Sequence, residues 1–225
     1  MKRNLDGASI VLAGASGGLG LHIGRRLVKE GAELVLFGRE ESRLANLDLP
    51  GPRTVGEIAD ASDCARAVEA AVSAYGQLDG VINASGVVAF GSLEELRPET
   101  ADELLATNLI GPIRLMQAAL PEIDRGGFLA NVSAIVAEHP MPGMAMYSAT
   151  KAALTALDRA LARELRSRRI DVIDLRPPHM ETGLVDRAIA GAPPRLPEGL
   201  APESVADRIV SAIQNGEREV PADAF

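Results

Sequence analysis

A glycine-rich turn near the N-terminus constrains the fold of this chain more than any other feature. The run Ser-Ile-Val-Leu-Ala at 9–13 is short and apolar, as in a buried strand, and a helix is expected over 19–30. Between them, Gly14-Ala-Ser-Gly-Gly-Leu-Gly20 has the spacing G-x-x-x-G-x-G. Glycines allow a tight turn, and the free N–H groups and dipole of a helix N-terminus attract phosphate. The turn therefore predicts a dinucleotide site whose contacts are Gly14, Ser16, Gly18, Leu19 and Gly20.

Strand and helix patterns alternate along the rest of the chain. Further strands are expected at 33–37, 54–58, 81–82, 128–133, 170–175 and 219–220. Further helices are expected at 40–47, 62–75, 98–119, 147–167 and 202–215, and Gly111-Pro112 interrupts the third of these. This alternation predicts an α/β fold with a doubly wound, Rossmann-type parallel sheet and helices on both faces. We expect one domain over 1–225, in which the Gly- and Pro-rich segment 183–200 is a substrate flap.

Composition excludes several classes of function. The net charge of −8 argues against nucleic acid or an anionic membrane as the partner. No apolar run approaches the ~18 residues of a membrane span, and the lone Cys64 fits a reducing cytoplasm. The three histidines have no metal-ligand spacing, so no metal is expected.

Tyr147 and Lys151 form the candidate catalytic pair. They are four residues apart on an expected helix, so they share one face. A phenol normally keeps its proton up to a pKa of ~10, and a nearby ammonium favours the phenolate and lowers that pKa. The pair is therefore suited to proton transfer near neutral pH.

The glycine spacing, followed in order by Asn83, Asn108 and Y-x-x-x-K, resembles the short-chain dehydrogenase/reductase family over nearly the whole chain. The resemblance implies a seven-stranded sheet, a nicotinamide cofactor and carbonyl/alcohol redox chemistry. It implies that Tyr147 gives or takes the proton and that Lys151 lowers its pKa and binds the nicotinamide ribose. It also implies that Asn108 holds a water of the proton relay and that Asn83 lies on the cofactor side.

The serine that the family uses in catalysis leaves two alternatives open. The family's serine usually lies thirteen positions before the tyrosine, which is Ala134 here, whereas Ser133 is one place earlier. Adjacent strand positions point to opposite faces. Ser133 keeps the catalytic role if the loop 135–146 holds one extra residue; otherwise Ala134 occupies the site. His139 in this loop is an alternative hydrogen-bond donor or a solvated loop residue.

The segment after the sixth expected strand, Arg-Pro-Pro-His-Met-Glu-Thr at 176–182, resembles the family's P-G-x-x-x-T sequence. The similarity implies that the Thr182 hydroxyl and the backbone near Met180 hold the nicotinamide carboxamide. Pro178 replaces the family's glycine, so the path of the chain there is expected to differ.

Arg39 indicates which nicotinamide cofactor binds. An acidic residue at the end of the second strand would bind the ribose hydroxyls and repel a 2′-phosphate, but Gly38 stands there and Arg39 follows. A guanidinium suits a phosphate, so we expect NADP(H), with NAD(H) as the alternative because Glu40 is adjacent. Asp60 resembles the family's adenine-side aspartate and could equally be a helix-cap acid.

The sequence therefore predicts a cytoplasmic oxidoreductase that transfers hydride between a nicotinamide and a small carbonyl or alcohol. The resemblance also implies a homodimer or homotetramer built through the two long helices. The alternative is a weakly active or inactive nucleotide-binding regulatory or scaffold protein, because Ala134 and Pro178 depart from the family pattern. A sugar-nucleotide epimerase or dehydratase is disfavoured because the chain lacks the length for its second domain.

Overall fold

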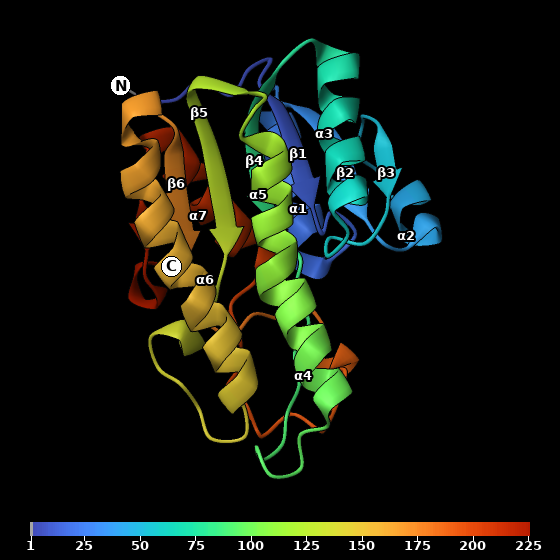
Figure 1. Ribbon diagram of the computed structural model, residues 1–225, viewed down its shortest axis with the longest axis vertical. Helices are drawn as coiled ribbons and strands as arrows, with labels where there is room; N and C mark the ends of the chain where they lie inside the picture. Colours follow the sequence, from blue (N-terminus) through green and yellow to red (C-terminus); the bar gives the residue numbers. More distant parts are fainter. Residues whose placement is uncertain (1) are drawn as a thin grey trace.

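A computed structural model describes residues 2–225, and its centre is one parallel sheet of seven strands (Figure 1). The strands lie in the order β3-β2-β1-β4-β5-β6-β7. Their bounds are β1 Ser9–Ala13, β2 Glu33–Gly38, β3 Arg53–Val55, β4 Leu78–Asn83, β5 Ile123–Val132, β6 Asp171–Leu175 and β7 Glu219–Val220. The chain builds outward from β1 to β3, returns to place β4 beside β1, and then builds outward on the other side. The predicted doubly wound sheet is confirmed.

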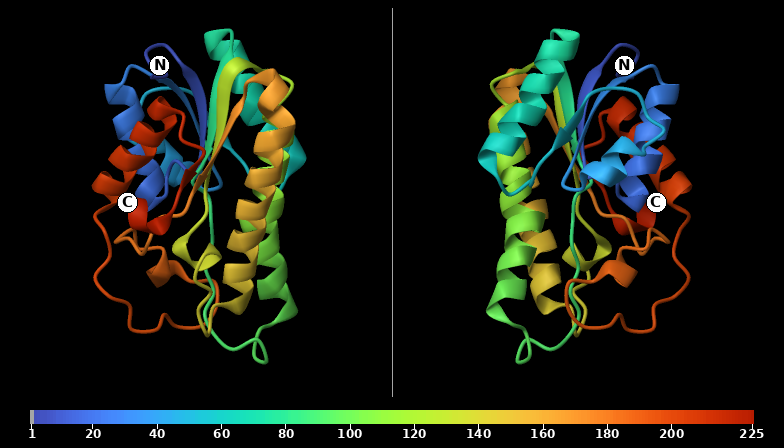
Figure 2. Two further views of the ribbon diagram at one scale, coloured as in Figure 1. Left: turned by 90° about the vertical axis from the view of Figure 1, so that its left-hand side faces the viewer. Right: turned by 90° about the vertical axis from the view of Figure 1, so that its right-hand side faces the viewer.

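Two layers of helices cover the sheet (Figure 2). The helices are α1 Gly18–Lys29, α2 Glu41–Ala45, α3 Ala61–Tyr75, α4 Pro98–Leu105, α5 Gly111–Ala119, α6 Ala145–Glu164 and α7 Pro202–Asn215. Helices α1 and α7 lie on one face, and α3, α4, α5 and α6 lie on the other (Figure 2). In the described part of the chain, no helix is long and apolar enough to cross a membrane.

Alternating strand residues supply the two halves of the core. In β1, Ile10 and Leu12 belong to the apolar cluster that includes α1 and α7, whereas Val11 and Ala13 belong to the cluster with α3 and α5. All four side chains are fully buried. Both faces of a central parallel strand are covered by helices, which is why the strand sequences are continuously apolar.

The expected helix over 98–119 is not one regular helix. It divides into α4, a π-helical turn at Ala106–Ile110, and α5. Pro112 has no N–H, so it removes the amide that would pair with the carbonyl of Asn108 four residues earlier. π-Helical segments occur mostly as single turns within α-helices, and frequently at functional sites.

Some strand bounds also differ from the expected ones. β3 is shorter than 54–58, and β4 begins at Leu78 rather than at 81. β5 begins at Ile123 and ends at Val132, so Ser133 follows the strand instead of ending it. The carboxyl ends of β1, β4, β5 and β6 point to the lower edge of the sheet in Figure 1, where α4 and α6 extend beyond it. In open α/β sheets, ligands bind at this edge beside the reversal of strand order, here between β1 and β4.

Candidate active site

One cavity of about 300 Å³ occupies this edge. It is bordered at one end by the glycine turn and Arg39, and at the other by apolar side chains around Tyr147. Within it lie most of the predicted site residues, namely Gly14, Ser16, Gly18, Leu19, Arg39, Ser133, Tyr147, Lys151 and Thr182. The fold thus brings together residues that are far apart in the sequence.

The glycine turn has the geometry of an anion cradle. Gly14 has φ +77°, and a Cβ there would lie 2.7 Å from the backbone of Ala84. Gly17 is the N-cap of α1 and has no side chain to accept the first amides of the helix. Those N–H groups are therefore available to an anion at the helix N-terminus. A Cβ at Gly18 would lie 2.5 Å from the Thr182 carbonyl oxygen, so the loop after β6 packs directly on the turn.

Tyr147 and Lys151 are buried side by side on α6. The Lys151 ammonium nitrogen lies 5.9 Å from the centroid of the Tyr147 ring and donates to the Val132 carbonyl at 2.8 Å. Burial lowers the pKa of Lys151 to about 8, against which the negative charges of Asp174 and Asp158 act. Burial also raises the pKa of Tyr147 to about 12, which is opposite to the direction expected from Lys151. In this arrangement, loss of hydration outweighs the attraction between phenolate and ammonium, and the phenol keeps its proton.

Asn108 is fully buried in the π-helical turn. Its Oδ1 accepts from the Val87 amide and its Nδ2 donates to the Val87 carbonyl, both at 2.9 Å. Nδ2 also lies 3.3 Å from the Thr150 hydroxyl oxygen. The side chain therefore fixes the strand-end loop after β4 against α6, while Pro112 leaves the Asn108 carbonyl without its usual helical partner.

The side chains of Asn83 and Ser133 form hydrogen bonds within the protein and do not point freely into the cavity. The Asn83 Oδ1 accepts from the Ser85 amide at 3.1 Å, which makes a strand-end turn. The Ser133 hydroxyl donates to the Lys151 carbonyl at 3.0 Å, and Thr155 donates to it at 3.1 Å. Ala134 adopts an extended conformation and packs with the apolar cluster that contains Tyr147. His139 is exposed, whereas His179 borders the cavity.

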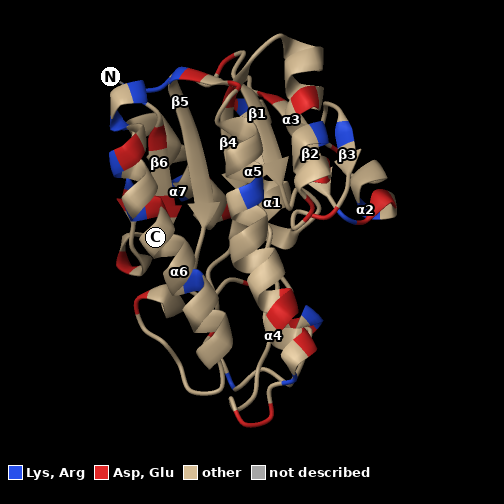
Figure 3. Ribbon diagram, in the orientation of Figure 1, with Lys and Arg blue, Asp and Glu red and all other residues tan. Residues whose placement is uncertain are grey.

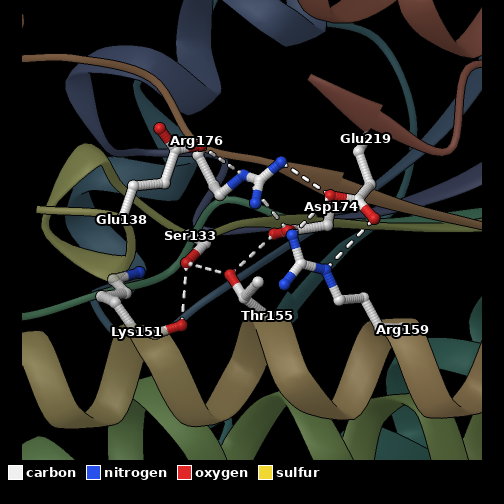
Figure 4. Close-up of polar contacts among 8 residues, drawn as sticks. All are labelled: Ser133, Glu138, Lys151, Thr155, Arg159, Asp174, Arg176 and Glu219. Carbon is white, nitrogen blue, oxygen red and sulfur yellow. Dashed lines mark hydrogen bonds and ion pairs between the residues drawn. The ribbon is translucent and has the colours of Figure 1, made fainter. Parts of the chain in front are cut away.

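An ionic network around the buried side chains of Asp174 and Arg176 was missed by the sequence analysis (Figure 4). The Arg176 guanidinium lies 2.8 Å from a carboxylate oxygen of Glu138 and of Glu219, and 3.4 Å from Asp174. The Thr155 hydroxyl oxygen lies 3.1 Å from an Asp174 carboxylate oxygen, and Arg159 pairs with Glu219. Burial raises the pKa of Asp174 to about 6. The signal was two charged residues, Asp174 and Arg176, within or beside an otherwise apolar strand.

The other end of the cavity carries two arginines. Arg39 borders it with a half-exposed side chain, and its nearest carboxylate, on Glu103, is 4.0 Å away. Arg43 also borders it and donates to the Ser16 carbonyl at 2.6 Å. The sequence analysis missed Arg43, although it lies one helical turn after Arg39.

Asp60 takes the helix-cap position among its two predicted roles. Its carboxylate accepts from the Ser62 hydroxyl and from the Asp63 and Ser62 amides at the start of α3, and these bonds lower its pKa. Among the described residues, Glu57 and Ile58 border the cavity here and Asp60 does not. The helix cap is therefore the role that its contacts show.

The segment expected to be a flap is held to the rest of the molecule by backbone hydrogen bonds. Ile189 donates to Val88, and Phe90 donates to Ala190, each at 2.9 Å. A short 3₁₀ helix, Val185–Arg187, borders the cavity. Thr182 donates through its amide to Met180 at 2.9 Å, so Pro178 is compatible with a compact turn after β6.

Comparison with known proteins identifies the family. The family model described as short chain dehydrogenase matches residues 8–191. An uncharacterised oxidoreductase of Methylorubrum extorquens is 35% identical over 197 residues, which cover 84% of this chain and 79% of that protein.

Two solved structures share the fold. A short-chain dehydrogenase/reductase of Serratia marcescens is 26% identical with a TM-score of 0.84, and the match covers 99% of both chains. A short-chain dehydrogenase of Burkholderia cenocepacia, solved in complex with NADP, is 24% identical with a TM-score of 0.85 and covers 99% of this chain and 98% of that one. With the glycine turn, Tyr147 and Lys151 on one cavity, this chain belongs to the short-chain dehydrogenase/reductase family of NAD(P)-dependent oxidoreductases.

Proposed function

We propose that this enzyme prefers NADP(H) and interconverts a small, largely apolar carbonyl compound and its alcohol, with Tyr147 as the proton donor or acceptor. The observation that carries the proposal is the buried Tyr147–Lys151 pair in the same cavity as an uncapped glycine-rich helix N-terminus. The cavity extends from a phosphate-binding helix N-terminus to a pair suited to proton transfer, and nicotinamide redox chemistry requires both.

The protonation states favour carbonyl reduction. Because the pKa of Tyr147 is raised to about 12, the phenol carries the proton that a developing alkoxide must receive. Lys151 supplies positive charge beneath it below about pH 8. The Asn108 carbonyl, which Pro112 leaves without its helical partner, is suited to hold a water that returns a proton to this pair.

The residues around the cavity fit a nicotinamide dinucleotide. The amides at the start of α1 would hold the pyrophosphate, and Lys151 would bind the ribose of the nicotinamide. Thr182 borders the cavity and packs on Gly18, which suits a contact with the nicotinamide, and Asn83 would support this side through its turn at Ser85. When bound, the nicotinamide supplies or accepts the hydride. Arg39 and Arg43 favour NADP(H), because two guanidinium groups at the adenosine end suit a 2′-phosphate.

The substrate end of the cavity favours an uncharged molecule. Its walls near Tyr147 are apolar, including Val88, Phe90, Val136 and Met144. Leu184 and Val185 of the 183–200 segment close the same end, which supports the role of this segment as a substrate flap within a single domain. A carboxylate or phosphate on the substrate would lose hydration against these apolar walls.

The test is Tyr147→Phe. We expect turnover of an identified ketone to be lost, while NADPH binding, followed by quenching of cofactor fluorescence, stays close to that of the unchanged protein. Removing one hydroxyl leaves the ring packing in place, so a folding defect is not expected. Turnover at the unchanged rate in this variant would refute the proposed mechanism.

A regulatory or scaffold role is the second candidate, and the alanine at position 134 favours it. It requires tight NADPH binding with no oxidation across a broad panel of apolar ketones and alcohols. The intact set of Tyr147, Lys151 and Asn108, all buried and the first two bordering the cavity, favours the enzymatic role.

We further propose a cytoplasmic homodimer or homotetramer. Along α5 and the first half of α6, most of the ribbon is tan in Figure 3, so few residues there are charged, which suits contact with a second copy. Cys64 is a buried free thiol, in keeping with a reducing compartment. A monomer in light scattering at micromolar concentration would overturn the oligomer.

A further inference from the structure

Lys151 is bound at two points by consecutive residues at the end of β5. Its ammonium donates to the Val132 carbonyl at 2.8 Å, and its own backbone carbonyl accepts from the Ser133 hydroxyl at 3.0 Å. We propose that Ser133 is a positioning residue that holds the Lys151 turn of α6, and that Ala134 is the residue beside the reacting substrate oxygen. This inference rests on the proposed function, because it assigns roles around the same catalytic pair.

The partners of Ser133 lie on the helix and not in the cavity. Ser133 is only 3% exposed, and both polar contacts of its hydroxyl are with α6, at Lys151 and Thr155. Ser133 and Ala134 both border the cavity, but successive extended residues direct their side chains to opposite sides. Ala134 accordingly packs with the apolar cluster that contains Tyr147. The substrate oxygen would therefore lie beside the Tyr147 hydroxyl and the methyl group of Ala134.

Counting protons shows that the Ser133 hydroxyl is committed to a larger network (Figure 4). Three contacts join four groups: Ser133 to the Lys151 carbonyl, Thr155 to Ser133, and Thr155 to Asp174. Two hydroxyls supply two protons, so all three contacts are hydrogen bonds only when Asp174 supplies the third. The other Asp174 oxygen has no hydrogen-bond donor among the described residues, and the group is 1% exposed. A protonated Asp174 completes the chain from β6 through α6 to the Lys151 turn.

The charges around Asp174 explain why its proton is available near neutrality. Burial raises its pKa to about 6, and the Arg176 guanidinium only partly offsets this effect. The other charged groups that act on Asp174 come from β7, the loop after β5, and α6. They are Glu219, Glu138, Arg159, Asp158 and Lys151. When Asp174 is ionised, the Thr155 hydroxyl donates its proton to the carboxylate. The contact between Thr155 and Ser133 is then left without a proton and is no longer a hydrogen bond.

The experiment compares Ser133→Ala with Thr155→Val and Thr155→Ser. A positioning role predicts that Ser133→Ala and Thr155→Val lower kcat by a similar factor of about 3–10, because each removes two of the three hydrogen bonds of the chain, including the one between Thr155 and Ser133. The double variant should be no slower than either single variant, since both remove the same link. Thr155→Ser keeps the hydroxyl, so its kcat should equal that of the protein without substitutions. Because Asp174 belongs to this chain of hydrogen bonds, the pH profile of kcat should have an inflection near pH 6. Thr155→Val should lose this inflection, and Thr155→Ser should keep it.

A catalytic Ser133 would behave differently. Ser133→Ala alone would then lower kcat by about 10²–10³-fold, while Thr155→Val would stay within twofold of the unchanged enzyme, and this pattern would overturn the inference. Unchanged rates in both variants would overturn it as well. Ala134→Ser is the complementary gain-of-function variant, and we expect it to raise kcat by placing a second hydroxyl beside the reacting oxygen. A failed proposed function is distinguishable, because only then does Tyr147→Phe keep its turnover.

Discussion

The ammonium nitrogen of Lys151 lies 5.9 Å from the centre of the Tyr147 ring, one helical turn away on α6. Burial acts on the two groups in the same sense, because it disfavours the charged form of each. The pair therefore exists at neutral pH as a neutral phenol beside a cation. The cation is present below the Lys151 pKa of about 8 and is lost above it.

We predict that kcat for carbonyl reduction declines as pH rises through about 8, because Lys151 loses its charge there. Lys151→Arg should react more slowly, but its decline should move to higher pH, since a guanidinium keeps its proton in proteins. Lys151→Met is the matched neutral control and should show no decline in this range. The measurement is a pH–rate profile at saturating cofactor; the same decline near pH 8 in Lys151→Arg would assign it to another group.

Asn108→Ala should destabilise the fold as well as impair turnover. It removes two hydrogen bonds to the Val87 backbone and leaves a buried donor and a buried acceptor without partners. Each such group costs about 1–3 kcal/mol, so we expect the free energy of unfolding, measured in urea, to fall by roughly 2–6 kcal/mol. Asn215→Ala on the exposed end of α7 is the control and should change it by less than about 0.5 kcal/mol. An equal loss in both variants would contradict this account of Asn108.

The sequence was sufficient for features that depend on local spacing. The strand, glycine turn and helix at 9–30 are contiguous, and Tyr147 and Lys151 share a helix face by their spacing alone. The direction of the Tyr147 pKa shift was wrong because burial is a property of the closed cavity, which no local pattern contains.

Other features required contacts between distant segments. Which way the Ser133 hydroxyl points depends on Lys151 and Thr155, which are 18 and 22 residues away. Arg43 reaches the glycine turn only because α2 folds back toward Ser16. The π-helical turn was anticipated only as an interruption, since Pro112 fixes which amide is missing but not how the helix adjusts.

The two arginines at the adenosine end should be separable by cofactor. Arg39→Ala should weaken NADPH binding by about 10–100-fold and leave NADH binding nearly unchanged, because only the 2′-phosphate loses a charge-assisted hydrogen bond. Arg43 also donates to the Ser16 carbonyl in the glycine turn. Arg43→Ala should therefore weaken both cofactors. Titration calorimetry with each cofactor provides the comparison, and equal losses of NADPH and NADH in Arg39→Ala would exclude the phosphate contact.

Asp174 should make stability depend on pH. Its pKa in the folded protein is about 6, above the ordinary value of 3.8, so the folded state binds this proton more tightly than the unfolded chain. The resulting stabilisation is complete below pH 3.8 and is lost as pH rises through 6. Two pKa units correspond to about 2–3 kcal/mol, which is the cost of burying the carboxylate at neutral pH.

Asp174→Asn keeps an oxygen that can accept from Thr155 and removes the ionisation. At pH 7.5 we expect its free energy of unfolding to exceed that of the unchanged protein by up to about 2 kcal/mol, less whatever the 3.4 Å contact with Arg176 contributes. At pH 4 the two proteins should differ little, because Asp174 is then protonated in the folded state and no buried carboxylate remains. Asp124→Asn, at an exposed carboxyl, is the control and should leave the pH dependence unchanged. If Asp174→Asn is instead less stable than the unchanged protein at pH 7.5 but not at pH 4, the pairing of the Asp174 carboxylate with Arg176 outweighs the burial cost.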